Sequence, residues 1–411
     1  MSNNVLIKNK KGYKKTKLGW IPEDWEVIKL GSIIEESTLK SSVENQLPVL
    51  TSSRRGLMYQ TDYYNEQNVI FNKSNIGFNI LPKGYITYRS RSDDGFFTFN
   101  LNKLADGIVS IYYPVFKTKF NDYFICSLLN ISSKILYKYA IGSSQKVLTI
   151  NDLSKILYAI PKIEEQEKIA EILSAWDDGI ETLEKLIEQK EIFHKALMKN
   201  LLIGKIRLFG YNSKWTHSKF NSIFERITRK NEELNSNILT ISAQNGLISQ
   251  KDFYNKRIAS VDTSKYILLK NGEFAYNKSY SNGYPLGAIK RLDLYEKGVV
   301  SSLYICFKLN NSDNCSDFWK YYFEAGMLNR EIKMIAQEGA RNHGLLNMAT
   351  EDFFNMILYH PKDSKEQQKI AEILNKSDKE IQLLNSKLEK LKEQKKGLMQ
   401  KLLTGQIRVK V

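Results

Sequence analysis

A nine-residue segment occurs twice in this chain, and this duplication constrains the fold more than any other feature. The first copy, EQEKIAEIL, starts at Glu165 and the second, EQQKIAEIL, starts at Glu366, a spacing of 201 residues. Both copies open a long helical pattern that ends in a related tail, LLIGKIR at Arg207 and LLTGQIR at Arg408. The tails keep the same spacing, so neither segment has an insertion or deletion relative to the other. The chain is therefore an internal repeat of two similar halves.

Each repeated segment predicts one long helix with a narrow apolar stripe. The apolar residues follow one another mostly at alternating steps of four and three, which is the heptad pattern of a coiled-coil seam. The seam residues are Ile169, Leu173, Trp176, Ile180, Leu183 and Ile187 in the first helix and Ile370, Leu374, Ile381, Leu384, Leu388 and Leu391 in the second. A surface helix packed on its own domain is the alternative, but such a helix needs a wider apolar face. We expect segments 160–207 and 360–411 to pair as an antiparallel coiled coil that acts as a spacer.

Polar residues interrupt this seam, and they indicate how the two helices align. They are Lys190, His194, Ser377 and Lys395. If the helices run antiparallel about a centre near Leu183, Lys190 lies opposite Ser377, and Trp176 lies opposite Leu391. Polar residues then face polar residues and apolar residues face apolar ones. We therefore expect this antiparallel register.

The remaining residues, 1–159 and 208–359, predict two similar globular domains. Short β-type runs occur at matching places, such as GYITY from Gly84 and GEFAY from Gly272, and turn-type residues separate them. An amphipathic helical pattern follows in each domain. The expected fold class is α+β (mixed α/β), with two similar domains joined by two long helices and related by an internal pseudo-twofold repeat.

Composition and missing motifs narrow the function to binding. The net charge of +16 at pH 7 favours a polyanionic partner. The three cysteines are scattered without a C-x-x-C pair, which argues against a disulfide framework or a zinc site and fits a reducing cytoplasm. No apolar run approaches the ~18 residues of a membrane span. The chain also lacks a phosphate-binding loop, a methyl-donor motif and a nucleophile elbow. We expect a cytoplasmic, non-catalytic protein that binds no metal or cofactor itself.

Loops at equivalent places in the two domains carry the groups that base recognition in DNA requires. Amide side chains pair with adenine and arginine pairs with guanine, while lysines contact phosphates and fix the position. The candidate DNA-binding residues are Arg89, Arg91, Gln145 and Lys146 in the first domain and Asn277, Lys278, Tyr280, Arg341, Asn342 and His343 in the second. Weaker candidates, just before a glycine that both domains share, are Arg54, Arg55 and Gln244. For each of them, a solvated or turn-forming side chain is the alternative.

The doubled motif resembles that of type I restriction–modification specificity subunits. Each copy has a proline, then E-Q-x-x-I-A-x-I-L, a following aspartate (Asp177 or Asp378), and L-M-x-x-L-L-x-G-x-I-R. The K-L-G opening with Trp25 also resembles this family. One departure is Ile203, where the family's tail usually has threonine. Another is His360, beside a proline that the family usually flanks with apolar residues.

The resemblance implies that each globular domain is a target recognition domain that reads one half of a bipartite, asymmetric site in double-stranded DNA. The paired helices, which are the conserved part of the family, then set the gap between the halves and dock two modification (methyltransferase) subunits. Two restriction (translocase/endonuclease) subunits can join. The chain itself is then a non-catalytic subunit of a DNA methyltransferase/restriction endonuclease complex. S-adenosylmethionine, Mg2+ and ATP are expected on the partner subunits.

Other functions explain parts of this pattern. A non-catalytic coiled-coil scaffold or an RNA-binding protein accounts for the helices and the charge, but not for two matched domains with different loops. A fused restriction–modification enzyme requires catalytic motifs that this chain lacks. Sequence-dependent binding to duplex DNA would separate these alternatives from a specificity subunit.

Overall fold

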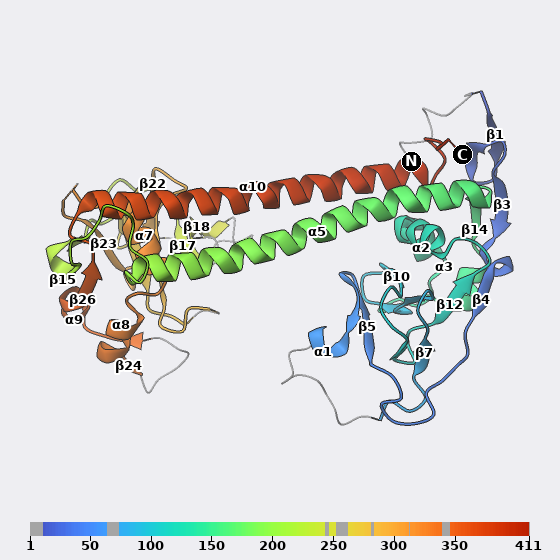
Figure 1. Cartoon of the computed structure of the whole chain (residues 1–411), viewed down its shortest axis with the longest axis horizontal. Helices are drawn as coiled ribbons and strands as arrows, with labels where there is room; N and C mark the ends of the chain where they lie inside the picture. Colours follow the sequence, from blue (N-terminus) through green and yellow to red (C-terminus); the bar gives the residue numbers. More distant parts are fainter. Residues whose placement is uncertain are drawn as a thin grey trace. The chain divides into compact units, whose positions relative to one another are not determined.

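A computed structural model of the chain describes residues 11–63, 74–242, 246–251, 262–280, 283–311, 313–338 and 346–410. The chain forms two compact units (Figure 1). Unit 1 comprises Met1–Glu184 and Lys387–Val411, and unit 2 comprises Lys185–Ser386. Each unit therefore contains one globular domain together with parts of both long helices.

The globular part of unit 1 is built on a four-stranded antiparallel sheet. Its strands, in spatial order, are β10 (Phe99–Leu101), β8 (Ile86–Tyr88), β12 (Val115–Thr118) and β4 (Ile34–Glu36). The aromatic rings of the cross-strand pair Tyr88 and Phe99 stack with centroids 4.5 Å apart, and both residues are buried. Helix α2 (Asp122–Ile131) packs on β10, and Asn121 caps it by accepting a 2.9 Å hydrogen bond from the Phe124 amide.

Two-stranded ladders and short helices surround this sheet. The ladders are β1 (Tyr13–Thr16) with β2 (Gly19–Pro22), β3 (Glu26–Lys29) with β14 (Leu157–Ile160), β5 (Leu50–Ser53) with β6 (Gly56–Tyr59), β7 (Asn79–Leu81) with β11 (Gly107–Val109), and β9 (Arg91–Ser92) with β13 (Lys146–Val147). The helices are α1 (Gln60–Tyr63), α3 (Ser133–Tyr139), α4 (Ile150–Ser154) and the 3-10 turn η1 (Leu30–Ser32).

Unit 2 repeats this topology. Its four-stranded sheet has the order β16 (Phe224–Arg226), β23 (Ile305–Leu309), β20 (Phe274–Asn277) and β21 (Ala288–Arg291). This spatial order matches that of the equivalent strands β4, β12, β8 and β10 in unit 1. The match confirms the predicted repeat of a mixed α/β domain. The core around this sheet contains more aromatic contacts than the core of unit 1. Phe274 stacks on Phe307 with ring centroids 5.4 Å apart, and both rings contact Phe323 of α7 (Ser316–Glu324).

Three ladders and the short helices of unit 2 follow those of unit 1, whereas the ladder of β24 with β25 corresponds in unit 1 only to an isolated bridge between Ile141 and Val147. The ladders are β15 (Thr216–Lys219) with β26 (Ile357–His360), β17 (Leu239–Ser242) with β18 (Gly246–Ser249), β19 (Ile267–Lys270) with β22 (Lys297–Val300), and β24 (Gln337–Glu338) with β25 (Leu346–Asn347). The helices are α8 (Asn329–Ile335), α9 (Thr350–Asn355) and the 3-10 turn η3 (Phe220–Ser222).

The repeated segments form the two long helices, α5 (Ile163–Leu202) and α10 (Ser364–Leu402), of 40 and 39 residues. In unit 1, Glu184 of α5 forms a 2.7 Å ion pair with Lys392, and Asp177 pairs with Lys395. In unit 2, Lys190 of α5 forms a 2.6 Å ion pair with Glu380. Residue numbers fall along one helix as they rise along the other, so the pairing within each unit is antiparallel (Figure 1).

The predicted register of this pairing is wrong by one helical turn. Ser377 lies opposite His194, whose Nδ1 is 2.9 Å from the serine Oγ, and not opposite Lys190. The expected register, centred at Leu183, was based only on seam residues that face each other. In the structure, polar seam residues also pair with acidic residues beside the seam, such as Asp177 and Glu380, and those ion pairs fix a different alignment.

The seam residues are buried or half-buried throughout, which is consistent with a coiled coil. Those below 9% exposure are Ile169, Leu173, Leu183, Ile187, Ile370, Leu374 and Leu388, and those of intermediate exposure are Trp176, Ile180, Ile381, Leu384 and Leu391. The ends of the seam have an additional role. Ile169 and Leu173 belong to the core of the globular part of unit 1, and Ile370 and Leu374 belong to that of unit 2. Near its start, each helix therefore packs on its own domain.

A buried carboxylate at the start of each helix ties three distant segments together. Glu165 of α5, 3% exposed, accepts hydrogen bonds from Trp25 Nε1 at 3.0 Å and from Arg408 Nε and Nη2 at 2.7 Å. Asp24 also pairs with Arg408, which lowers the pKa of the Asp24 carboxyl, and the hydrogen bonds to Glu165 and Asp24 raise the pKa of the Arg408 guanidinium. The arginine lies just beyond the end of α10, so the cluster joins the start of α5 to the tail that follows α10.

The same cluster recurs in unit 2 with the equivalent residues. Glu366 is 1% exposed and accepts hydrogen bonds from Trp215 Nε1 at 3.2 Å and from Arg207 Nε at 3.0 Å. The two aspartates of the repeated motif also have equivalent partners. Tyr123 donates a hydrogen bond to Asp177, and Tyr321 donates one to Asp378 at 2.6 Å. Burial and these carboxylates raise the pKa of both tyrosines. The motif residues therefore connect each helix to its domain.

Candidate nucleic-acid interface

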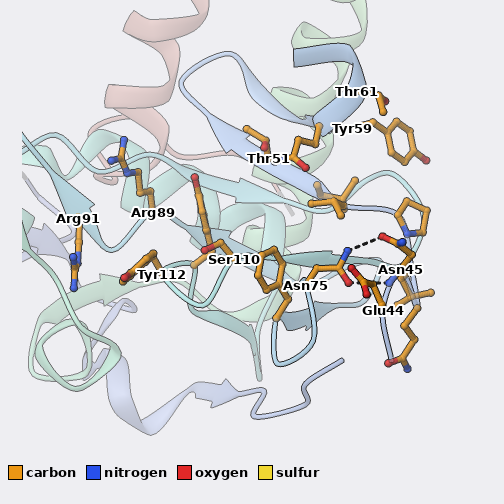
Figure 2. A pocket seen from close by; sticks show the side chains of 18 of the residues that line it. Glu44, Asn45, Thr51, Tyr59, Thr61, Asn75, Arg89, Arg91, Ser110 and Tyr112 are labelled. Carbon is orange, nitrogen blue, oxygen red and sulfur yellow. Dashed lines mark hydrogen bonds between the residues drawn. The ribbon is translucent and has the colours of Figure 1, made fainter. Parts of the chain in front are cut away.

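Two adjoining hollows open on the globular part of unit 1. The first has a volume of about 940 Å³ and the second about 810 Å³. They share wall residues, namely Thr51, Arg89, Arg91 and Tyr113. Figure 2 shows the first hollow, with Arg91 next to Tyr112. We treat the two hollows as one surface, the arginine-lined hollow.

The fold brings the two loops predicted in the first domain together on this surface. Arg89 follows β8, and Arg91 lies in β9, which pairs with the β13 residues Lys146 and Val147. The Leu148 amide also donates to the Ser90 carbonyl at 2.9 Å. Arg89, Arg91 and Gln145 all line the first hollow, so residues more than 50 positions apart form one wall.

The weaker candidates Arg54 and Arg55 join the same surface from the turn between β5 and β6. Both line the second hollow. Arg54 pairs with Asp94, and its guanidinium lies 5.3 Å from the Phe96 ring centroid. The hydrogen bond from Arg54 lowers the pKa of Asp94 to about 2. The positive charge of Arg54 is therefore partly compensated within the domain.

Other candidates also have partners within unit 1. Gln145 Nε2 donates to Asp93 Oδ1 at 2.8 Å, and Lys146 Nζ lies 4.9 Å from the Tyr137 ring centroid. Arg91 lies over the Tyr112 ring at 4.3 Å. Arg89 is exposed and has no ion pair with any residue that the structure describes. The hollow thus offers guanidinium and amide donors, and the carboxylates of its rim already hold some of them.

The corresponding segments of unit 2 are also joined by a backbone hydrogen bond, but without a counterpart of the β9–β13 ladder among the described residues. The Leu346 amide donates to the Lys278 carbonyl at 3.1 Å, as Leu148 does to Ser90 in unit 1. Asn277 Oδ1 accepts a 3.1 Å hydrogen bond from the Ser279 amide, so this side chain forms a turn, which was the alternative to base reading. Tyr280 is 60% exposed. The candidates Gln244, Arg341, Asn342 and His343 lie outside the described residues.

Sequence reasoning missed two features of these surfaces. Tyr112 contributes to the first hollow, but a lone tyrosine in a loop gives no signal of its partner. Unit 2 also has a hollow of about 540 Å³ beside the buried Lys290, which contacts Glu324 at 2.5 Å and the Tyr284 hydroxyl at 3.1 Å. Among the described residues, no group of three or more His, Cys, Asp or Glu side chains could hold a metal ion. No helix in the described part of the chain is long and apolar enough to cross a membrane.

A family model of the type I restriction modification DNA specificity domain matches residues 22–192, which include the arginine-lined hollow. A putative type I restriction enzyme MjaX specificity subunit of Methanocaldococcus jannaschii is 24% identical over 440 residues, which cover 97% of this chain and 97% of that protein. Residues 22–192 thus match the DNA specificity domain of this family, and the chain is similar to a type I specificity subunit over nearly its whole length.

A second relative and two solved structures show the same similarity. The type I restriction enzyme MjaVIII specificity subunit of the same organism is 30% identical over 223 residues, so the match spans 49% of this chain and about half (51%) of that protein's length. The crystal structure of a type I restriction-modification S subunit from M. genitalium has a TM-score of 0.54 at 14% identity and covers 92% of this chain and 96% of its own. A structure described for complex assembly and conformational transition of the type I R-M system has a TM-score of 0.54 at 13% identity, with 94% and 99% covered. The solved structures share the specificity-subunit fold with this chain.

Proposed function

We propose that this chain is the sequence-reading component of a DNA methyltransferase and restriction complex, and that each globular domain reads one half of a bipartite, asymmetric site. One observation carries the proposal: the two units repeat one topology, but their equivalent loops carry different side chains. Where unit 1 has Arg89 and Arg91 after β8, unit 2 has Asn277 as the last residue of β20 and Ser279 after it. A repeated scaffold with different reading residues suits two related half-sites of different sequence.

The charge and the surface chemistry support DNA as the ligand. A net charge of +16 favours binding to a polyanion, and the arginine-lined hollow offers exposed guanidinium groups that pair with guanine or with phosphate. RNA would also satisfy the charge. A double-stranded DNA site is favoured because the major groove of B-DNA presents base edges that arginine and amide side chains can pair with, whereas the deep, narrow major groove of an RNA helix does not admit side chains.

The same proposal gives the long helices two roles. They set the gap between the half-sites, and they dock two methyltransferase subunits, while two restriction subunits join the complex. The half-buried seam and the cross-helix ion pairs support a stiff spacer. S-adenosylmethionine is then bound by the methyltransferase subunits, and ATP and Mg2+ by the restriction subunits. The complex acts on DNA in the cytoplasm.

The test is to co-express this chain with the methyltransferase encoded beside it and to map methylated adenines in the host DNA. A single two-part motif with a fixed gap supports the proposal. A purified complex that yields no motif would contradict it and favour the scaffold. Tight binding to RNA without preference among DNA duplexes would favour the RNA-binding alternative.

A further inference from the structure

Arg91 and Tyr112 form a stacked pair on the wall of the arginine-lined hollow. The Arg91 guanidinium carbon lies 4.3 Å from the centroid of the Tyr112 ring. Arg91 is exposed and Tyr112 is 45% exposed, so the pair lies at the surface. The N–H donors of Arg91 lie in the plane of its guanidinium group. A ring against one face therefore fixes the orientation of the fork without occupying a donor.

The backbone anchors this pair on both sides. The Ser90 amide and hydroxyl both donate to the Tyr112 carbonyl, at 3.0 and 2.8 Å, so the ring is tied to the residue next to Arg91. Arg91 itself lies in the ladder with Val147. The stack therefore joins two short segments whose main chains are already fixed.

Among the arginines of the hollow, this arrangement separates Arg91 from the others. Arg54 is paired with the carboxylate of Asp94, so its charge is partly neutralised. The described residues place no carboxylate in an ion pair with Arg91. A guanidinium that is stacked and not paired with an acid keeps its donors for a ligand and loses little conformational entropy on binding.

The internal repeat provides a comparison within the same chain. In unit 2 the place of Arg91 is held by Ser279 and the place of Tyr112 by Leu303, according to the matched strand sequences that flank them. Both members of the pair are thus absent together from the second domain. That is expected if the tyrosine is present to position the arginine, and if the two domains read different bases.

We propose that Arg91 is a guanine-reading residue of the first domain and that Tyr112 is its positioning residue. This inference rests on the proposed function. The two-pronged contact of arginine with O6 and N7 of guanine is the commonest specific contact in the major groove. Arg91 supplies the fork, and Tyr112 holds it in the orientation that such a contact requires. The first domain then specifies a G·C pair that the second domain does not read in this way.

The experiment measures competition binding by the complex of this chain with its methyltransferase. The probes are duplexes of the mapped site in which each guanine in turn is replaced by 7-deazaguanine, which lacks the N7 acceptor. We expect wild type to discriminate against replacement at one position of one half-site by roughly 5- to 150-fold. Arg91→Ala should lose this discrimination at that position alone. Arg55→Ala removes the same charge from the same hollow, and should weaken binding to all duplexes alike.

The positioning role has its own pair of variants. Tyr112→Phe keeps the ring face and should retain the discrimination, whereas Tyr112→Leu should lose most of it while the thermal stability of the complex is unchanged. Retained discrimination in Arg91→Ala overturns the reading role, and equal behaviour of the two Tyr112 variants overturns the positioning role. These results leave the bipartite motif intact and so differ from failure of the proposed function, in which the wild-type complex would prefer no duplex.

Discussion

The buried carboxylate Glu165 predicts a specific and testable dependence on the C-terminal tail of the chain. Its side chain is 4% exposed and has two cationic or polar partners, the indole of Trp25 and the guanidinium of Arg408. Substitution Arg408→Met removes the only cation that pairs with Glu165 in the described part of the chain and leaves a buried, uncompensated charge. Breaking a buried pair in this way typically costs about 3–5 kcal/mol. Because 35% of the Arg408 side chain is exposed, water can reach the vacated place, and we expect the lower end, about 3 kcal/mol.

Calorimetry together with hydrogen exchange measures this effect. For a unit of about 200 residues, a loss of about 3 kcal/mol lowers the melting temperature by roughly 6–12 °C, and hydrogen exchange should show the loss in unit 1. The matched control is Arg207→Met, which breaks the equivalent bond to Glu366 and should destabilise unit 2. The double variant Glu165→Gln/Arg408→Met replaces the carboxylate by a neutral amide that still accepts from Trp25. It should therefore be more stable than Arg408→Met alone. A double variant as unstable as the sum of the two single variants would refute the reasoning, because the effects would then be independent.

Four further substitutions test other parts of the structure. His360 is buried, and desolvation lowers its pKa, so its neutral form stabilises unit 2. That contribution is present above the unfolded pKa of about 6.5 and is lost as the pH falls below it. In pH-dependent melting, His360→Gln should therefore flatten the loss of stability below about pH 6.5, and an unchanged slope would argue against this role. Lys395→Met leaves Asp177 without its cross-helix cation and should cost about 1–2 kcal/mol in denaturant unfolding. Lys369→Met, which breaks an exposed pair on one helix, should cause no measurable change; equal effects would contradict the seam assignment. Gly179 lies within α5, and a Cβ there meets no described atom within 4 Å, so Gly179→Ala should stabilise the chain by about 0.5–1 kcal/mol in the same assay, whereas destabilisation would indicate an unseen constraint.

The sequence predicted the repeat and the long helices because both depend on local, periodic information. Ile169 and Leu173 follow the heptad steps, and the spacing of 201 residues between the two copies needs no knowledge of the fold. The register of the helices could not be predicted in the same way. It depends on which polar side chains reach each other across the seam, and His194 proved to be the partner of Ser377.

The role of the repeated glutamate was equally beyond sequence reasoning. Glu165 is 140 residues from Trp25 and 243 from Arg408, so nothing local indicates that they meet. For the candidate DNA-binding surface, the sequence placed Arg91 and Gln145 on two separate loops, and only the structure shows that both residues line one hollow. The sequence did not indicate that Asp93 and Asp94 hold Gln145 and Arg54, since such pairs depend on how the loops fold onto each other.

Exchange of one globular domain tests whether each domain reads its own half of one DNA site. The measurement is the methylated motif of host DNA after residues 208–359 are replaced by the corresponding domain of another specificity subunit, with the helices and the first domain unchanged. We expect a motif in which one half changes, while the other half and the gap between them are retained. A motif in which both halves change, or one that is identical to that of the wild type, would contradict it.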